Sequence, residues 1–195
     1  MKTCYFLLFL ILILWGGNAF YQCDEIPHIY AMVDIAHEFT FYFDGRFGNA
    51  YLRPIGGQDA RCWASLSNAD LENINLLVIP QGATPCPYTP SDIRKVVSYV
   101  REGGGLLMIG NYGIPKGEQE FMLNALAKMF QVEFIGEKPK GKLRLERNPI
   151  VGEGVEVQGN ANCLLSFKAG RWLPIVVDEN GYPVVAVREF GKGRV

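Results

Sequence analysis

Seven polar side chains follow three short apolar runs of the sequence, and they are the candidates for binding or catalysis. They are Asp34, His37 and Glu38 after residues 29–33, Gln81 and Thr84 after residues 76–79, and Asn111 and Tyr112 after residues 106–109. If these runs are parallel strands, their carboxyl ends share one sheet edge, where α/β proteins bind ligands. We therefore predict that the seven residues line one crevice. Solvated loops, or an acidic cap on a following helix, explain the same residues and remain an open alternative.

The first of these loops also contains the groups that acid–base catalysis needs. A histidine beside carboxylates titrates near neutral pH, so Asp34, His37 and Glu38 could supply a general acid and a general base. The sequence therefore allows a hydrolase that acts on an amide or glycosidic bond. A zinc-protease motif is not present here, because Phe41 stands where its second histidine would be.

Cysteine and histidine do not form a metal-binding pattern. The chain has two histidines and no C-x-x-C arrangement, so we expect no metal and no cofactor. Once an N-terminal leader is removed, the chain holds Cys23, Cys62, Cys86 and Cys163. In an oxidising compartment these cysteines permit three disulfide pairings, and buried free thiols are an equal alternative. Cys86 lies between two prolines that keep its backbone extended, which disfavours it as a nucleophile.

The first nineteen residues have the pattern of a secretory signal peptide. Lys2 is followed by the apolar run 5–15, and Gly17 and Ala19 are small residues at the positions that signal peptidase inspects. The run is shorter than the roughly 20 residues of a membrane-spanning helix. We therefore expect a signal peptide over residues 1–19 and a secreted or extracytoplasmic protein. A membrane association is expected only if the signal is retained as an anchor.

Strands and helices alternate in the first half of the sequence. Apolar runs at 29–33, 76–79 and 106–109 predict buried strands, and 51–55 predicts a weaker one. A helix is expected to begin at Thr89 or Ser91, because apolar residues recur at helical spacing from there to Val100. The glycines 103–105 come after this helix and before a strand. They therefore predict a helix stop and a tight turn rather than a phosphate-binding loop, which needs the opposite order.

The second half combines one helix with several short strands. A helix is expected over residues 118–130, and strands at 143–145, 155–157, 163–167, 175–177 and 184–187. The predicted fold is α/β: a flavodoxin-like parallel sheet with flanking helices, and added antiparallel strands in the second half. We expect one domain over residues 20–195. Because residues 191–195 stand where another strand would begin, we also expect that domain to be truncated at its C-terminus.

Several blocks of the sequence resemble the class I glutamine amidotransferase-like fold, in its secreted and membrane-associated, poorly characterised branch. The blocks are Asp34 with His37, 71–80, 88–93, 99–110, 123–126 with 130–134, 148–150, and 183–187 with 191–195. Together they cover residues 29–195. The helix, glycine triplet and strand of 99–110 form the most specific block.

The resemblance implies a catalytic triad that this chain lacks. Catalytic members carry a nucleophilic cysteine in the turn after a strand, with glycines two residues to either side, and a histidine and a glutamate later in the chain. Here residues 110–113 are Gly-Asn-Tyr-Gly, and His28 and His37 both precede that turn. A thiolate and a base are needed to attack an amide carbonyl. We therefore expect a non-catalytic binding or interaction module, part of a larger extracytoplasmic protein.

Composition and charge limit the partners of such a module. Of the residues, 49% are hydrophobic and 20% are charged, which excludes an intrinsically disordered chain. The formal net charge is -1, so no strong positive field exists to attract nucleic acid. The expected partner is a small neutral or sugar-like ligand, or another protein. Tyr112 offers an aromatic ring on which a sugar can stack.

Overall fold

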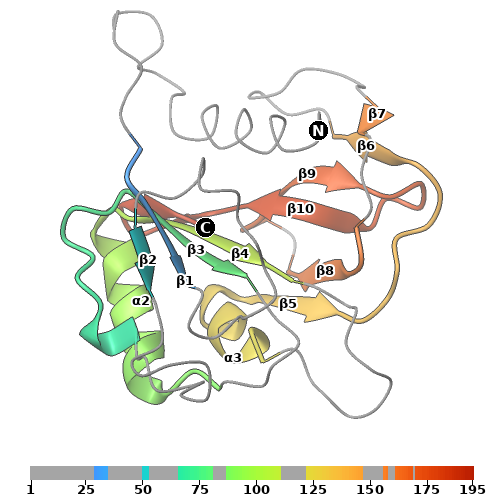
Figure 1. Cartoon of the computed structure of the whole chain (residues 1–195). Coiled ribbons are helices and arrows are strands. Elements are labelled where there is room, and N and C mark those ends of the chain that lie inside the picture. Colours follow the sequence, from blue (N-terminus) through green and yellow to red (C-terminus); the bar gives the residue numbers. More distant parts are fainter. Residues whose placement is uncertain are drawn as a thin grey trace, which may run out of the picture.

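The structure is a computed structural model of the chain, and the description covers eight stretches of it. They are residues 29–34, 50–52, 66–80, 87–110, 122–146, 156–157, 161–168 and 170–195. These stretches form three β-sheets and a small number of helices (Figure 1). The signal peptide predicted over residues 1–19 lies outside the described residues.

The largest sheet has six strands and is almost entirely parallel. Its order is β11-β12-β4-β3-β1-β2, and β11 at one edge is its antiparallel strand. The strands are β1 (Ala31–Asp34), β2 (Ala50–Leu52), β3 (Leu76–Pro80), β4 (Gly105–Ile109), β11 (Glu189–Phe190) and β12 (Gly193–Arg194). All five residues of β3 are buried, as expected for a central parallel strand covered on both faces. The prediction of a parallel sheet built on the runs near residues 29, 76 and 106 is confirmed.

Helix α2 (Pro90–Glu102) connects β3 to β4 and begins at a capping box. The Thr89 hydroxyl accepts from the backbone N–H of Asp92, and the Asp92 carboxylate accepts from the backbone N–H of Thr89 at 2.9 Å. The same carboxylate accepts from the backbone N–H of Ser67 at 2.9 Å, in the 3₁₀ helix η1 (Leu66–Asn68). Gly103 ends the helix at a φ of 130°, which only glycine adopts readily. The predicted helix and its glycine stop are therefore confirmed.

The helix predicted over residues 118–130 is shorter and less regular than expected. Residues 118–121 lie outside the described part, and the remainder forms a four-residue helix, α3 (Asn124–Ala127), and a 3₁₀ turn, η2 (Lys128–Phe130). The turn ends at Gln131, whose φ of 61° lies in the left-handed region. This conformation reverses the chain into β5 (Val132–Ile135), a strand that the helical pattern did not predict.

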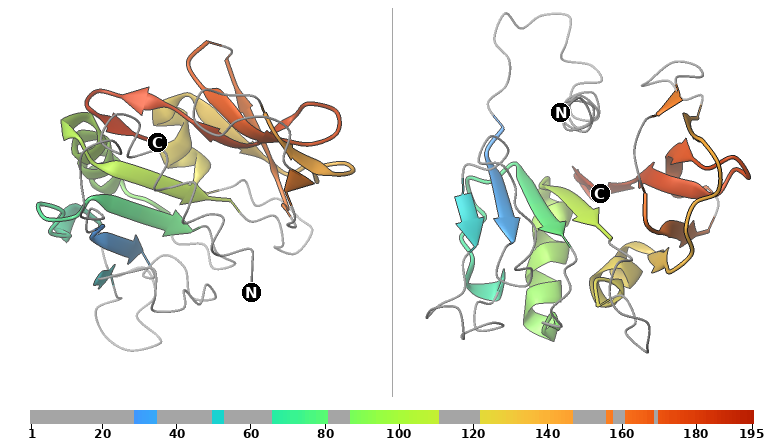
Figure 2. Two further views of the ribbon diagram at one scale, coloured as in Figure 1. Left: turned by 90° about the horizontal axis from the view of Figure 1, so that it is seen from above. Right: turned by 45° about the vertical axis from the view of Figure 1, so that its right-hand side comes forward.

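The second half adds antiparallel strands, as predicted. Strand β5 pairs with β8 (Leu164–Phe167), and a four-stranded sheet has the order β10-β9-β6-β7. Its strands are β6 (Leu143–Leu145), β7 (Glu156–Val157), β9 (Leu173–Val177) and β10 (Pro183–Val187). Figure 2 shows these strands beside the parallel sheet, in two further orientations.

The hairpin between β9 and β10 is held by a buried carboxylate. Asp178 has no exposed surface and accepts from the backbone N–H groups of Lys140, Asn180 and Tyr182 at 2.9–3.0 Å. Burial alone would raise the pKa of Asp178, but these N–H donors and the charge of Lys140 outweigh burial and lower the pKa. Gly181, at a φ of 82°, completes the turn.

The main hydrophobic core joins the parallel sheet to the added strands. Val96 and Val100 of α2, Leu126 of α3 and Leu77 of β3 are all fully buried in it. The same core includes Val132, Phe134, Cys163 and Trp172 from the second half. Helices α2 and α3 therefore cover one face of the parallel sheet. None of the helices in the described ranges combines the length and apolar character that a membrane crossing requires.

Candidate functional site

A crevice was predicted at the carboxyl edge of the parallel sheet, and the structure describes one of the seven residues predicted to line it, Asp34. Strands β1, β3 and β4 end side by side at this edge, with Pro80 of β3 beside Ile109 of β4. After β1 the chain adds β2 on one side of it and then β3 on the other side. Open α/β sheets bind ligands at such a point, where the strand order reverses. Asp34 is the last residue of β1. The other predicted site residues, His37, Glu38, Gln81, Thr84, Asn111 and Tyr112, lie outside the described residues.

Asp34 is fully buried rather than exposed to a ligand. Its side chain has no solvent-accessible surface, and it takes part in interactions with its surroundings. Buried carboxylates in native proteins are hydrogen-bonded, because an unsatisfied one costs several kcal/mol. Asp34 therefore fits a structural role at the end of β1.

The end of β4 is covered by the β5–β8 ribbon, the antiparallel pair formed by β5 and β8 together with Cys163, the residue before β8. A Cβ atom placed on Gly110 would lie 2.3 Å from the ring of Phe134 and 3.0 Å from Sγ of Cys163. The Cys163 thiol also donates to the carbonyl oxygen of Gly110, at 3.6 Å. Glycine is thus the residue that lets the ribbon approach β4 closely. Phe134 and Cys163 are parts of this edge that the sequence analysis did not identify.

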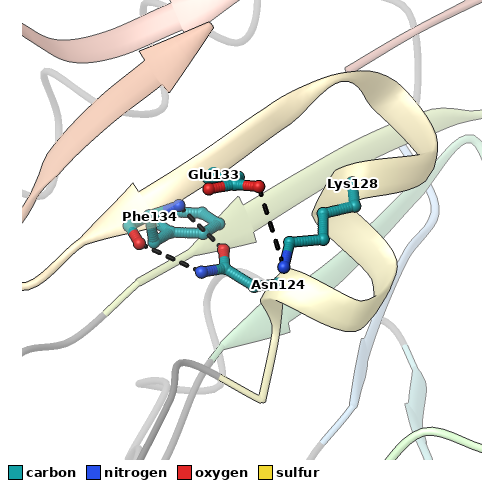
Figure 3. Close-up of polar contacts among 4 residues, drawn as sticks. All are labelled: Asn124, Lys128, Glu133 and Phe134. Carbon is teal, nitrogen blue, oxygen red and sulfur yellow. Dashed lines mark hydrogen bonds and ion pairs between the residues drawn. The ribbon is translucent and has the colours of Figure 1, made fainter.

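Phe134 is positioned by an asparagine of α3 (Figure 3). The side chain of Asn124 accepts from the backbone N–H of Phe134 at 2.8 Å and donates to its carbonyl oxygen at 3.0 Å. Beside this pair, Nζ of Lys128 lies 3.7 Å from Oε1 of Glu133. More than half of each side chain is exposed, so this ion pair adds little to the stability of the fold. The one sequence signal for this arrangement was the alternation of Val132, Glu133 and Phe134, in which Glu133 alone is exposed.

The thiol at this edge is not activated for nucleophilic attack. Cys163 is buried and free of any disulfide, which settles one of the four cysteines whose pairing the sequence left open. Burial raises the pKa of its thiol to about 11, so the thiol is protonated at neutral pH. Because the thiolate is the nucleophilic form, Cys163 is suited to packing and not to catalysis. Cys23, Cys62 and Cys86 lie outside the described residues.

A hollow lies at the opposite, amino edge of the sheet. It encloses about 320 Å³ and is lined by Gly103, Gly105, Glu189, Gly191, Lys192, Gly193 and Arg194. Its glycines are explained by close packing of the β11–β12 hairpin on the end of α2. A Cβ on Gly193 would lie 2.2 Å from the carbonyl oxygens of Val100 and Gly104. The backbone N–H of Lys192 donates to the carbonyl oxygen of Arg101 at 3.0 Å. The hollow thus has the glycines of a tight junction rather than those of a phosphate loop.

Within the described stretches, the titratable groups do not form a metal centre. No group of three or more histidine, cysteine, aspartate or glutamate side chains is placed there to hold an ion. Neither histidine of the sequence belongs to the described stretches.

Comparison with known proteins identifies a solved structure of similar fold but no sequence family. A scan against models of known protein families finds no match. A search of curated proteins finds no match either. Among solved structures, the chain is similar to the mmIFT52 N-terminal domain, with a TM-score of 0.52, 12% identity, and coverage of 81% of this chain and 79% of that one. It also aligns with the exo-beta-1,4-mannosidase Op5Man5 from Opitutaceae bacterium strain TAV5, at a TM-score of 0.43 and 13% identity, over 86% of this chain and 30% of that one. The first likeness concerns the fold alone.

Proposed function

We propose that this protein is an exported, non-catalytic binding or interaction module with a degenerate amidotransferase-like site, and part of a larger extracytoplasmic protein. The observation that carries the proposal is the position of β4. This strand lies between β3 and β12 and ends at Ile109. Residues 110–113 follow it in the sequence, where catalytic members of the resembled fold carry their cysteine. The sequence there is Gly-Asn-Tyr-Gly, which contains no thiol.

Two further observations support a site without hydrolytic chemistry. The thiol of Cys163, which lies against the end of β4, is kept protonated by burial. Asp34 has no exposed surface, so its carboxyl group is not presented to a substrate in solution. A nucleophile and an accessible base are the minimum for amide hydrolysis through a covalent intermediate.

The strand order supports the flavodoxin-like arrangement that is part of this proposal. Counted along the chain, the parallel strands β1, β2, β3, β4 and β12 occupy the spatial order 2-1-3-4-5, which is the order of flavodoxin-like sheets. In that arrangement a ligand binds at the carboxyl edge, next to β1 and β3. The ligand that we propose is small and neutral or sugar-like, because the polar side chains predicted at this edge mix donors and acceptors around the aromatic ring of Tyr112. The alternative within this proposal is that the carboxyl edge binds another protein instead of a small ligand.

A thermal-shift screen tests the proposed site. Monosaccharides, glutamine and nucleotides are added to the wild type, to an Asn111→Ala, Tyr112→Ala double variant, and to Tyr182→Ala as a control. Tyr182 is 57% exposed in the β9–β10 turn, so the control removes an exposed tyrosine ring that is not one of the predicted site residues. We expect a neutral sugar-like ligand to raise the melting temperature of the wild type and of Tyr182→Ala, and to have no effect on the double variant. Equal stabilisation of all three proteins would place the binding site elsewhere.

An activity assay separates this proposal from the hydrolase alternative. Wild-type protein is incubated with glutamine, peptide and glycan libraries, and the products are followed by mass spectrometry. No turnover is expected above a no-protein blank. Turnover that disappears in His37→Ala would overturn the non-catalytic proposal in favour of acid–base chemistry in the loop after β1.

A further inference from the structure

Two arginines from different segments of the second half meet at the C-terminal end of η2. Arg171 precedes β9, and Arg188 lies between β10 and β11. Nη1 of Arg171 lies 3.1 Å and Nη1 of Arg188 lies 3.2 Å from the side-chain oxygen of Gln131. Because both guanidinium groups reach the same oxygen atom, a single anion that lies close to this oxygen can contact both of them.

The positive charges of these two arginines are not neutralised in the described part of the chain. Their hydrogen-bond acceptors are the neutral amide of Gln131 and the backbone carbonyl of Phe130. Other basic residues do have acidic partners, since Arg144 pairs with Glu146 at 3.2 Å and Arg194 with Glu189 at 3.7 Å. Burial lowers the pKa of the Arg188 guanidinium, and the nearby charge of Arg171 lowers it further. Two cations that repel each other this closely are stabilised by an anion.

Arg188 is held in place before any ligand arrives. Its guanidinium donates to the carbonyl oxygen of Phe130 and lies over the ring of Phe190, 5.4 Å from the ring centre. Phe190 in turn packs edge-on against Phe130, at 5.0 Å between ring centres. The indole N–H of Trp172 donates to the same Phe130 carbonyl at 3.0 Å. A fixed guanidinium loses less conformational entropy when it binds an anion.

Gln131 adopts a backbone conformation that a non-glycine residue rarely takes. Its φ is 61°, and it is the one non-glycine residue with a positive φ among those described. Asparagine and glycine are the usual residues there, and their side chains are too short to bridge two arginines. Backbone strain of this kind tends to persist where a side chain has a task, and the task visible here is to orient two guanidinium groups.

We propose that Arg171 and Arg188 form a binding site for one tetrahedral oxyanion, a phosphate or sulfate group carried by a ligand or partner. Each arginine uses Nη1 for its contacts within the protein, and Nε and Nη2 have no acceptor in the described part of the chain. Two converging guanidinium forks match an anion with three or four acceptor oxygens better than a planar carboxylate. The site uses other residues than the proposed neutral-ligand crevice at the carboxyl edge and is independent of it.

Titration with simple anions tests this site directly. Inorganic phosphate, sulfate and acetate are added separately to the full chain at constant ionic strength, and the Nε–H signals of ¹⁵N-labelled arginine side chains are recorded by NMR. We expect saturable shifts of the Arg171 and Arg188 signals with phosphate and sulfate, and a weaker response to acetate. A response to acetate as strong as that to phosphate would overturn the preference for a tetrahedral group.

Three variants distinguish a specific site from a general attraction to positive charge. Gln131→Glu places a carboxylate between the two arginines without changing the shape of the side chain, and Arg171→Ala removes an exposed arginine whose one described contact is Gln131. Each is expected to weaken phosphate binding by about tenfold, as for the loss of a charged hydrogen-bond partner. Arg94→Ala, on the exposed face of α2, also removes one positive charge and should bind like the wild type.

Circular dichroism and melting temperatures confirm that each variant is folded. If folded Gln131→Glu and Arg171→Ala bind phosphate as the wild type does, or if Arg94→Ala weakens binding equally, the proposal is overturned. A failure of the neutral-ligand screen leaves this result unaffected, because the two sites share no residue.

Discussion

The methyl group of an alanine would not fit at Gly110, the residue after β4. The same close packing sets the reactivity of the Cys163 thiol beside it. Gly110 has no side chain, so Phe134 and Cys163 pack directly against its backbone. This packing buries the Cys163 thiol and raises its pKa to about 11. One glycine therefore accounts both for the close approach of the β5–β8 ribbon and for the low reactivity of the cysteine beside it.

The Cys163 thiol should make stability depend on pH in the alkaline range. Its ordinary pKa is 9.0, and its pKa in the folded protein is about 11. A raised pKa means that the folded state favours the protonated thiol, so this stabilisation is complete below about pH 9 and is lost as the pH rises towards 11. Urea unfolding between pH 8 and pH 11 should therefore show a smaller loss of stability for Cys163→Ala than for the wild type.

Thiol labelling gives an independent measurement of the same property. At pH 8 a thiol reagent should label Cys163 slowly in native protein and rapidly in urea, and Cys163→Ala provides the background from the other cysteines. Rapid labelling of Cys163 in the native protein would contradict a buried, protonated thiol.

At the scale of elements, the β5–β8 ribbon and β4 depend on each other. The ring of Phe134 occupies the space that a Cβ on Gly110 would need. Asn124 fixes the backbone of Phe134 by two hydrogen bonds, so the ring has little freedom to move away. The helix, the ribbon and the end of the parallel strand thus form one packed unit.

Gly110→Ala should destabilise the protein through a clash with this ring. Overpacking a close-packed interior typically costs about 1–3 kcal/mol, and a Cβ 2.3 Å from the Phe134 ring is such a case. In a Phe134→Leu background the same substitution should cost less, because the smaller side chain leaves room. Chemical denaturation of the four proteins of this double-mutant cycle measures the difference. Additive effects would show that Gly110 and Phe134 do not meet.

Sequence patterns predicted the elements whose signals are local and missed those set by distant contacts. Helix α2 has a cap, helical spacing and a glycine stop, and all three were visible in the sequence. Strand β5 was missed because its alternation spans few residues and follows a helical pattern without a glycine. The helix ends instead at the left-handed Gln131. Nothing in the sequence near Gln131 indicates this conformation, since the arginines that hold its side chain lie 40 and 57 residues further along.

The position of Asp34 at the end of a parallel strand was predictable from the sequence, but the environment of its side chain was not. The end of β1 at Asp34 was correctly placed at the carboxyl edge of a parallel sheet. Complete burial of Asp34 was not foreseen, because burial depends on side chains that the fold brings from elsewhere in the chain. For the same reason, the contact between Cys163 and Gly110 could not be derived from their spacing in the sequence, where they are 53 residues apart.

At the scale of the whole molecule, the second half is not an appendage to the parallel sheet. The main core contains residues of β3, β4, α2 and α3 together with Phe134, Cys163 and Trp172. Strand β10 faces this core through Ala186 and a smaller core through Val184, Val185 and Val187. The chain then returns to the parallel sheet as β11 and β12, so both parts are bound into one packed body.

Phe130 lies where these parts meet, and its removal should weaken both of them. Its side chain is fully buried and contacts Phe190, and its carbonyl accepts from Trp172 and Arg188. Phe130→Ala is expected to cost about 3–5 kcal/mol, the usual range for a buried phenylalanine. Met129→Ala, at the adjacent residue that is 50% exposed, should cost far less and serves as the control. Hydrogen exchange should show lower protection of the β3–β4 amides and of the β9–β10 amides together in Phe130→Ala. Loss of protection in one of these strand pairs alone would mean that the two parts unfold separately and that the shared core does not couple them.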